Sequence, residues 1–591
     1  MMEGNYKKLG LALSGGGFRA SFYHIGVLAR MADLGLLRYV EVISTVSGGS
    51  IIGALYYLHV KKLLEEKKDF EIRDEDYQEI IAKIEADFLE AVQKNLRLRT
   101  FLNPLKNFKM CLPNYSRSDH IGELYDKFLY RKVLNSNNTE PIKMKDLKIK
   151  PSGENTSFHP LKDNYKRSAK VPILLINATI LNNGHNWCFS ASDMGETDTD
   201  YSKKKIDKNF RLKRVESYKD IYKHEDFELG LAVAASACVP GIFAPLAISN
   251  LYDEEIRLQL VDGGVNDNQG ISGLLDKRFT CTHFIISDAS GQMKDEREPK
   301  IQISNVIKRA NSILTDNLRD RQLTYMLKEH SDNVAILHLK KGIPVKEVSY
   351  FDNRHNLKGE TKLCNTEQPS EAFRINSDVQ NLLSGIRTDL DSFSDVEAYS
   401  LMLDGYRISQ YELEKENIKS FVTNTELKEG KYQFFKIDSW ISSPVLDSYY
   451  KNLLEIASIR SFKALRINLP LKLITLFLVL LVCGALIDTF GSRFMDWANE
   501  SISKGQLLLM ILLLIILFIL KKGMNATTNR TFSVMFLLKV LPFLFLSLTS
   551  FLLIGLYLIT FDRLFLCLGS YNALEKAQRK LKETREIDSL S

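Results

Sequence analysis

Three long apolar stretches distinguish the last quarter of the chain from the more polar residues before it. Residues 471–487 are almost wholly apolar, residues 507–520 are apolar without a break, and residues 532–568 are apolar with few interruptions. A membrane-spanning helix needs about 20 residues, so the last stretch fits one long helix or a two-helix hairpin. A single stretch of this kind also fits the buried core helix of a soluble protein, but three in succession favour a membrane. We therefore predict three or four transmembrane helices over residues 467–570.

The basic residues around the apolar stretches predict how the chain is oriented in the membrane. Lys463, Arg466 and Lys472 lie at the start of the first stretch, the loop KKGMNATTNR after the second is strongly basic, and residues 488–506 between them are slightly acidic. Lys and Arg concentrate on the cytoplasmic side of membrane proteins. This pattern predicts an integral membrane protein with a cytoplasmic catalytic part and a charged cytoplasmic tail over residues 571–591. It also favours four helices over three. The N-terminus has no apolar core long enough for a signal peptide, which agrees with this orientation.

The first three-quarters of the chain has the pattern of a soluble α/β protein. Short apolar runs suited to buried strands alternate with segments of helical periodicity over about 340 residues. The runs lie at residues 9–13, 40–46 and 171–181, around Trp187, and at 256–264, 282–290 and 333–340. We predict a layered α/β core with a central, mostly parallel sheet flanked by helices. This catalytic domain occupies residues 1–345 with a polar insertion at about 134–170, and a mixed, partly helical extension follows at 346–466.

The composition argues against several other kinds of protein. The net charge of +7 is modest and no compact basic stripe interleaved with aromatic residues is present, so we expect no nucleic-acid partner. The seven cysteines are scattered without a C-x-x-C pair, which argues against a disulfide framework and a thiolate zinc site. No cluster of metal ligands is present in the sequence, so neither a metal nor a cofactor is predicted. The sequence leaves the oligomeric state open.

The first of two glycine-rich turns is Ser14–Arg19, with the sequence SGGGFR. It follows the predicted strand at 9–13 and precedes a segment of helical periodicity that begins near Ser21. Consecutive glycines let backbone N–H groups converge on one point, and a helix N-terminus adds positive potential there. Such a nest binds a phosphate or a developing oxyanion. The nucleotide-binding patterns G-x-x-x-x-G-K-[ST] and G-x-G-x-x-G are both absent from the turn.

The second turn places Ser47 between a strand and a helix, in the sequence TVSGGS. Small neighbours, here Gly48 and Gly49, allow the sharp turn of a nucleophile elbow, which exposes the serine hydroxyl at a helix N-terminus. A negative charge that forms there is stabilised. Thr45 occupies the usual first glycine position of G-x-S-x-G, and the two other serines nearby lack these flanks. An ordinary Ser-Gly turn is the alternative interpretation.

An Asp-Gly-Gly sequence follows the predicted strand that ends near Val261. The Asp262 carboxylate can accept the serine proton as a general base, although an Asp-Gly turn is the alternative. The order of the motifs favours catalysis, because the glycine nest is followed by the serine about 30 residues later and by Asp262 about 215 residues after that. Asp267 is more typical of a turn residue. His24, on a helix among apolar neighbours, is more typical of a packing residue than of a triad member.

These motifs together resemble those of the patatin-like phospholipases, whose catalytic pair is a serine and an aspartate without a histidine. The resemblance covers about residues 8–300. SGGGFRASFYHIGVLARMADLG resembles the oxyanion motif and first helix, ISTVSGGSIIGALYY the serine elbow, AASACVPGIFAPL the small-residue segment before the aspartate, and LVDGGVNDNQG the Asp-Gly-Gly motif. Two departures are Ser14, where plant members carry Asp, and Thr45 in place of the elbow glycine.

The resemblance implies roles for individual residues. Ser47 is then the nucleophile and Asp262, in the motif with Gly263 and Gly264, is the base that activates it. The implied oxyanion donors are Gly15, Gly16 and Gly17. Arg19 matches the basic position of the oxyanion motif and is expected to steady that loop.

We therefore expect a membrane-anchored lipid acyl hydrolase of the phospholipase A or lysophospholipase type, with membrane lipids as both substrate and anchor. An acyltransferase that passes the same acyl-enzyme to an alcohol is one alternative. A catalytically silent membrane scaffold is another, although the retention of Ser47 and Asp262 counts against it. A transporter ranks lowest, since the apolar stretches contain few polar residues that can line a pathway.

Overall fold

The computed structural model describes residues 6–110, 114–134, 140–197, 208–221, 223–253, 256–291, 293–359, 362–364, 369–414, 416–422, 429–467 and 547–590. The chain forms two compact units. The first consists of Met1–Thr100, Asn114–Arg460 and Leu566–Ser591, and the second of Phe101–Pro113 and Ser461–Phe565.

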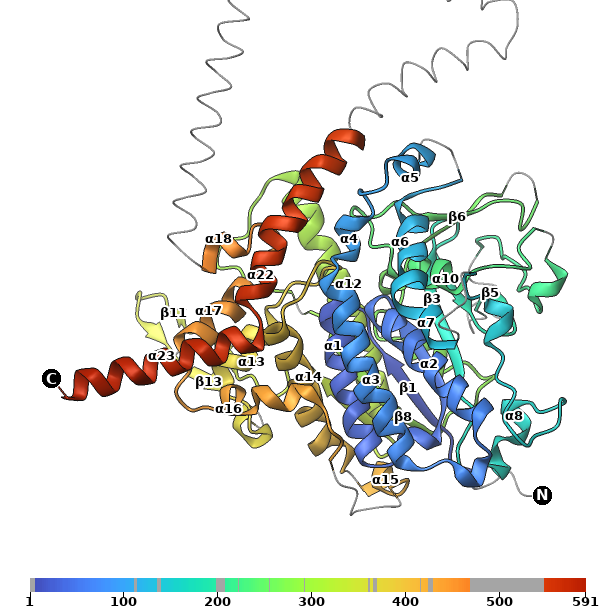
Figure 1. Cartoon of the computed structure of the whole chain (residues 1–591), viewed down its shortest axis with the longest axis horizontal. Coiled ribbons are helices and arrows are strands. Elements are labelled where there is room, and N and C mark those ends of the chain that lie inside the picture. Colours follow the sequence, from blue (N-terminus) through green and yellow to red (C-terminus); the bar gives the residue numbers. More distant parts are fainter. Residues whose placement is uncertain are drawn as a thin grey trace, which may run out of the picture. The chain divides into compact units, whose positions relative to one another are not determined.

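A nine-stranded sheet forms the centre of the first unit (Figure 1). Its strands are β1 (Leu9–Leu13), β2 (Val40–Val46), β3 (Ile173–Ile180), β4 (Asn186–Phe189), β5 (Met194–Glu196), β6 (Leu246–Ile248), β7 (Leu258–Asp262), β8 (His283–Asp288) and β9 (Val334–His338). The run β3-β2-β1-β8-β9 is parallel, whereas β4 to β7 pair antiparallel beside β3. Parallel strands are buried on both faces, which explains their continuous runs of Val, Ile and Leu. The predicted α/β core with a mostly parallel sheet is thus confirmed.

Helices that begin directly after the first two strands cover one face of the sheet. They are α1 (Gly17–Asp33) and α2 (Gly48–Glu66), and α1 also contacts α3 (Asp74–Gln93) and α14 (Asp395–Leu413). Gly26 of α1 and Gly405 of α14 let these two helices touch, because a Cβ at either position would collide with a backbone carbonyl of the other helix. Helix α14, which lies within the predicted extension at 346–466, therefore belongs to the same compact unit as the sheet.

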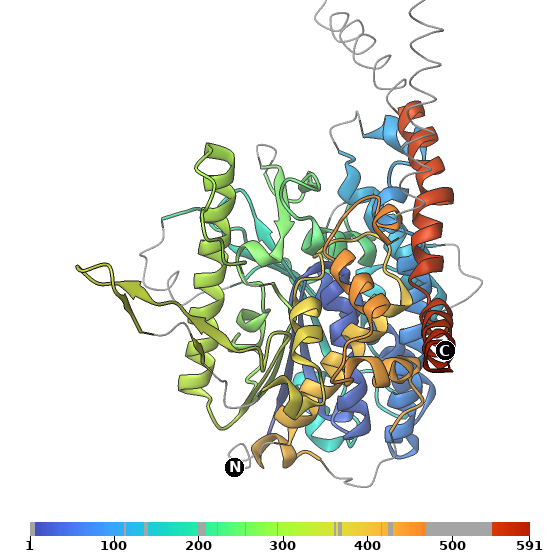
Figure 2. The same cartoon turned by 90° about the vertical axis from the view of Figure 1, so that its left-hand side faces the viewer.

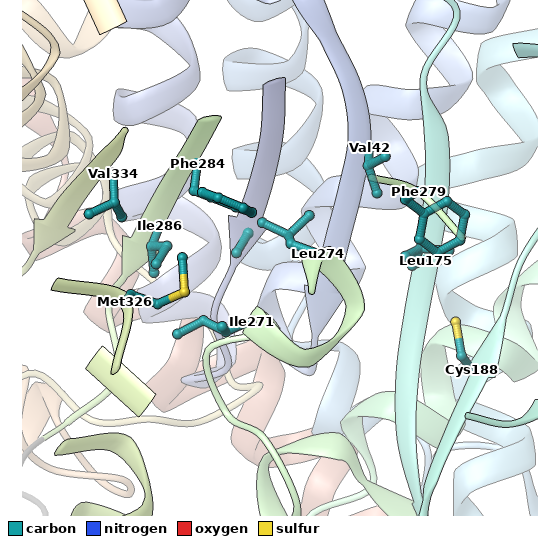
Figure 3. Packing of buried hydrophobic residues seen from close by; sticks show 11 residues of the cluster. Val42, Leu175, Cys188, Ile271, Leu274, Phe279, Phe284, Ile286, Met326 and Val334 are labelled. Atoms are coloured by element: carbon teal, nitrogen blue, oxygen red, sulfur yellow. The ribbon is translucent and has the colours of Figure 1, made fainter. Parts of the chain in front are cut away.

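The opposite face of the sheet is covered by α11 (Ile271–Leu274) and α12 (Ile303–Glu329), and Figure 2 shows α12 on the side away from α1 and α3. In Figure 3, Ile271 and Leu274 of α11 and Met326 of α12 gather around Phe284 and Ile286 of β8. Full burial of an aliphatic or aromatic side chain stabilises a fold by about 1.5–3 kcal/mol, so this cluster fixes both helices on the sheet.

The remaining elements of the described chain are short, apart from the last helix and the apolar helix that precedes it. The helices are α4 (Leu96–Arg99), α5 (Pro104–Lys109), α6 (Arg117–Tyr125), α7 (Arg131–Leu134), α8 (Pro160–Asp163), α10 (Leu229–Ala237), α13 (Ser377–Ser384), α15 (Glu416–Lys419), α16 (Asp438–Ile441), α17 (Ser448–Ile456), α18 (Ala464–Ile467), α22 (Arg563–Leu568) and α23 (Tyr571–Leu590). Two small hairpins pair β10 (Val345–Glu347) with β13 (Lys362–Cys364) and β11 (Tyr350–Phe351) with β12 (Leu357–Lys358).

One helix in the described part of the chain, Ser547–Leu568, is long and apolar enough to cross a membrane. It corresponds to the C-terminal part of the third predicted stretch. The first two predicted stretches, at 471–487 and 507–520, lie outside the described residues. The cytoplasmic orientation and the count of three or four helices stay predictions.

Candidate active site

Two neighbouring strand–turn–helix units bring the glycine loop and the serine turn together. Strands β1 and β2 are parallel and pair Leu13 with Thr45, so both chains leave the sheet at the same edge. The two turns are joined directly, because the Gly49 N–H donates to the Ser14 carbonyl at 3.1 Å. Each turn leads into a helix, α1 or α2, whose N-terminus therefore faces this edge. The local pattern of strand, glycine turn and helix is the one that the sequence predicts.

Ser47 occupies the tight turn between β2 and α2 in a strained backbone conformation. Its φ is 50° and its ψ is −117°, values that a residue with a side chain seldom adopts. Its N–H donates to the Ser236 hydroxyl at 3.0 Å, which anchors the turn from α10. Gly48, the first residue of α2, follows at once and leaves no Cβ against the neighbouring Gly17 backbone. This is the geometry of a nucleophile elbow.

The Ser47 hydroxyl donates to the Asp262 carboxylate, with Oγ and Oδ2 2.6 Å apart. The sheet explains this contact across 215 residues. Val46 ends β2 opposite Asn177 of β3, and Asp262 ends the antiparallel strand β7 opposite Ala178, the next residue along β3. Strands β2 and β7 thus meet end to end along β3, with Ser47 and Asp262 at the junction.

The Asp262 carboxyl is buried and carries only two hydrogen bonds from the described protein groups around it. Oδ2 accepts from the Ser47 hydroxyl, and Oδ1 accepts from the Gly264 N–H at 2.8 Å. Burial raises the pKa of Asp262 to about 6, while these two hydrogen bonds act to lower it. At neutral pH the group is a carboxylate whose proton affinity is well above that of an exposed aspartate. Such a group suits proton transfer near pH 7.

The glycine loop lies beside Ser47, but its three glycines are not equivalent. The Gly15 N–H donates to the Asn268 carbonyl at 2.8 Å, so it is not free to bind an oxyanion as the sequence predicted. Gly16 and Gly17 have φ values of 139° and 59°. In the part of the chain that the structure describes, the N–H groups of Gly16, Gly17 and Gly48 have no hydrogen-bond acceptor. These three donors remain for an anion at this edge.

Arg19 anchors the glycine loop from within the protein. Its guanidinium donates to the carbonyls of Ile386 (2.9 Å), Ser384 (3.3 Å) and Ala289 (2.9 Å), and burial lowers its pKa to about 10. The steadying role expected for Arg19 fits these contacts. A direct role as an oxyanion donor does not, since both terminal nitrogens, Nη1 and Nη2, donate to backbone carbonyls.

Two further ionisable residues near the site have structural partners. His24 Nε2 lies 2.9 Å from the Ser14 carbonyl, so this nitrogen carries the proton and Nδ1 accepts from the Ser287 hydroxyl at 2.7 Å. Burial lowers the pKa of His24 to about 4, which keeps the ring neutral. Asp267 accepts from the N–H groups of Gly270 and Ser272 and thereby caps a turn.

Among the described residues, no group of three or more His, Cys, Asp and Glu side chains is placed to hold a metal ion.

A serine network behind the elbow was missed at the level of sequence. Ser236 accepts from the Ser47 N–H, donates to the Asn177 carbonyl at 2.5 Å, and lies 2.8 Å from the Ser50 hydroxyl. Ser50 in turn donates to the Thr45 hydroxyl at 2.9 Å. The available signal was the small-residue segment AASAC, which supplies Ser236 from α10. Thr45, the departure from the elbow pattern, is therefore a member of the hydrogen-bonded support.

Comparison with known proteins finds a family model and several solved structures that are similar to this chain. Residues 11–275, a little under half of the chain, match the model of the patatin-like phospholipase family. Human GIVD cytosolic phospholipase A2 aligns at 12% identity and a TM-score of 0.37, over 70% of this chain and 62% of that one. Its complex with methyl gamma-linolenyl fluorophosphonate and terbium chloride aligns at 14% identity, a TM-score of 0.35, and 70% and 59% coverage. VipD from Legionella pneumophila aligns at 13% identity and a TM-score of 0.23, over 79% of this chain and 85% of that one.

This chain thus spans about three-fifths of the length of the human phospholipase chains that it matches. A search of curated proteins gave no significant match.

Proposed function

We propose that this protein is a membrane-anchored lipid acyl hydrolase that cleaves carboxylic esters through a Ser47–Asp262 dyad. The observation that carries the proposal is the 2.6 Å hydrogen bond from the hydroxyl of a strained elbow serine to a buried aspartate. The match of residues 11–275 to the patatin-like phospholipases supports lipid esters as the substrate class. The apolar helix Ser547–Leu568 supports attachment to the membrane that contains them.

In the first step, Ser47 Oγ bonds to the ester carbonyl carbon while its proton passes to Asp262 Oδ2. The carbonyl oxygen becomes an oxyanion, for which the N–H groups of Gly16, Gly17 and Gly48 are the proposed donors. When the tetrahedral intermediate collapses, the bond to the alcohol breaks and Asp262 returns the proton to the leaving oxygen. The fatty acyl group stays on Ser47 as an ester.

In the second step, Asp262 takes a proton from a water molecule that attacks the acyl-enzyme. The same oxyanion donors stabilise the second intermediate, and its collapse releases the fatty acid and restores the Ser47 hydroxyl with the proton from Asp262. Because one carboxyl group serves as base and as acid in turn, a pKa near 6 is favourable for both transfers.

The proposal is tested with full-length protein in detergent, a fluorophosphonate serine probe, and fatty-acid release from mixed phospholipid micelles. Ser47→Ala should abolish labelling and lower release by about 10⁴-fold or more, and Asp262→Asn should lower both by about 10³- to 10⁴-fold. Ser44→Ala is the matched control for the serine and Asp267→Asn for the aspartate. Both are buried neighbours outside the dyad, and both variants should keep activity.

Folded wild-type protein that neither reacts with the probe nor releases fatty acid would refute the hydrolase. Labelling that persists in Ser47→Ala would show that another residue is the nucleophile. Addition of a lysophospholipid acceptor to the same assay separates hydrolysis from acyl transfer, since a transferase would form diacyl product in place of free fatty acid.

A further inference from the structure

The segment Ser384–Asp391, here called the strap, connects α13 to the turn before α14 and lies against the glycine loop. The Phe18 N–H donates to the Asp389 carbonyl at 3.0 Å, directly after the free N–H of Gly17. A Cβ on Gly17 would lie 2.7 Å from the Asp389 carbonyl oxygen and 2.9 Å from the Asp389 nitrogen, so the two backbones are in close contact. The strap also supplies two of the three carbonyls that Arg19 binds.

The side chain of Asp389 is held as firmly as its backbone. Its carboxylate is only 2% exposed, and it pairs with Arg97 at 2.5 Å and more distantly with Arg460 at 3.7 Å. The Arg97 N–H donates to the Leu390 carbonyl at 3.2 Å, so Arg97 binds the strap through backbone and side chain. A buried aspartate that loses such a partner leaves an uncompensated charge, which makes this pair a strong constraint on the strap.

Two more buried ion pairs, both made by Arg387, hold the middle of the strap. Arg387 donates to Asp391 at 2.7 Å, to Glu397 at the first turn of α14, and to the Ser392 carbonyl at 2.6 Å. The Arg387 N–H also donates to the Ala457 carbonyl at 3.2 Å. The strap is therefore fixed from α4, from α14 and from the segment after α17, rather than by the glycine loop alone.

We propose that Asp389 is a positioning residue for the oxyanion donors, an inference that rests on the function proposed above. The hydrogen bond from the Phe18 N–H and the close contact of Gly17 with the Asp389 backbone together hold the end of the glycine loop that carries the Gly17 N–H. The position of this N–H therefore depends on the position of the Asp389 backbone. The Arg97 pair holds that backbone in place. Asp389 acts on the reaction through Gly17 and does not touch the substrate.

The test measures kcat and KM of Asp389→Asn with a water-soluble short-chain p-nitrophenyl ester. Active sites are counted by end-point titration with the fluorophosphonate probe, so misfolded molecules are excluded. Per titrated site, kcat should fall by about 10- to 100-fold while KM stays within about twofold, because donors displaced by a fraction of an ångström stabilise the oxyanion poorly but leave substrate binding unchanged.

Asp74→Asn is the matched control, since Asp74 is also a largely buried aspartate paired with an arginine (Arg38, 3.2 Å) but lies beside Gly35, beyond the opposite end of α1. It should lower thermal stability without changing kcat per site. A kcat of Asp389→Asn within about twofold of wild type would overturn the inference.

If Asp389→Asn gives no folded protein, Arg97→Lys decides the question. It keeps the positive charge but not the forked donor, so kcat per site should fall by about three- to tenfold, and an unchanged kcat would overturn the inference. Wild-type protein without esterase activity would instead refute the proposed function, whatever the variants show.

Discussion

The two strand–turn–helix units that form the site follow the same backbone path but present different chemical groups. In the first, β1 leads through Gly16 and Gly17 into α1, and in the second, β2 leads through Ser47 into α2. Both turns contain positive φ angles, 139° and 59° at the glycines and 50° at the serine. The strands are neighbours in register, so both turns face the same edge of the sheet.

The difference lies in what each turn presents. The first turn has no side chains at its tight residues and leaves backbone N–H groups free, which an anion requires. The second places a side chain at a backbone angle that normally favours glycine, and thereby exposes a hydroxyl next to Asp262. Of these two turns, only the second has a side chain at a positive φ, at the position where the proposed chemistry needs a hydroxyl.

Replacing Ser47 removes the side chain that distinguishes the second turn from the first. Ser47→Gly and Ser47→Ala should both lose at least about 10⁴-fold in activity, because neither has a nucleophile. Their stabilities should differ, however. At φ 50° the glycine variant should be more stable than the alanine variant by about 1 kcal/mol, since only alanine retains the strained Cβ.

Thermal or urea unfolding of the two purified variants measures this difference, and wild-type protein gives the reference. Equal stability, or a more stable alanine variant, would show that the elbow stores no strain at Ser47.

The second prediction concerns how activity and stability depend on pH through the Asp262 carboxylate. Because Asp262 must be deprotonated to act as a base, kcat/KM should fall about tenfold per pH unit below about pH 6. Stability should change in the opposite direction. The folded pKa of about 6 lies above the ordinary value of 3.8, so the folded state binds this proton more tightly than the unfolded state. The group therefore contributes about 3 kcal/mol to the free energy of unfolding below pH 4, and this contribution is lost as the pH rises through 6.

Rate profiles of wild type and unfolding curves of wild type and Asp262→Asn between pH 4 and pH 8 check both halves of this prediction. The Asn variant should lack this part of the pH dependence of stability. An acid limb of the rate near pH 4 would mean that the carboxyl is more solvated than its burial indicates.

Local pattern was sufficient to predict the two turns but not how the site is assembled. The runs that form β1 and β2, the glycines after them and the helices that follow are contiguous in the sequence, so residue type and spacing predict them. The pairing of Ser47 with Asp262 depends on β7 meeting β2 end to end along β3. This is a non-local feature that only the order of motifs and the family resemblance indicated.

The sequence did not predict the different hydrogen bonding of the three glycines or the contact of the strap with the glycine loop. Nothing in three consecutive glycines distinguishes Gly15, whose N–H is taken by Asn268, from Gly16 and Gly17. The sequence IRTDLD likewise has no periodicity, and its contact with the glycine loop depends on non-local partners in α4, in α14 and after α17. Residues 384–391 therefore contact the glycine loop although no motif in them marks that contact.

The smallest expected effect tests the support behind the serine turn. Ser236→Ala removes the acceptor of the Ser47 N–H and leaves that buried donor unpaired, which should lower stability by about 1–3 kcal/mol. Because the elbow also loses its link to Asn177, kcat per titrated site should fall by about two- to fivefold. Ser400→Ala is the control, since Ser400 is equally buried and bonds Tyr450 at 2.8 Å from α14. It should lose stability but not rate. If both variants lose only stability, the hydroxyl of Ser236 contributes to the fold and not to the alignment of Ser47, and the second turn would then be held by its strand and helix alone.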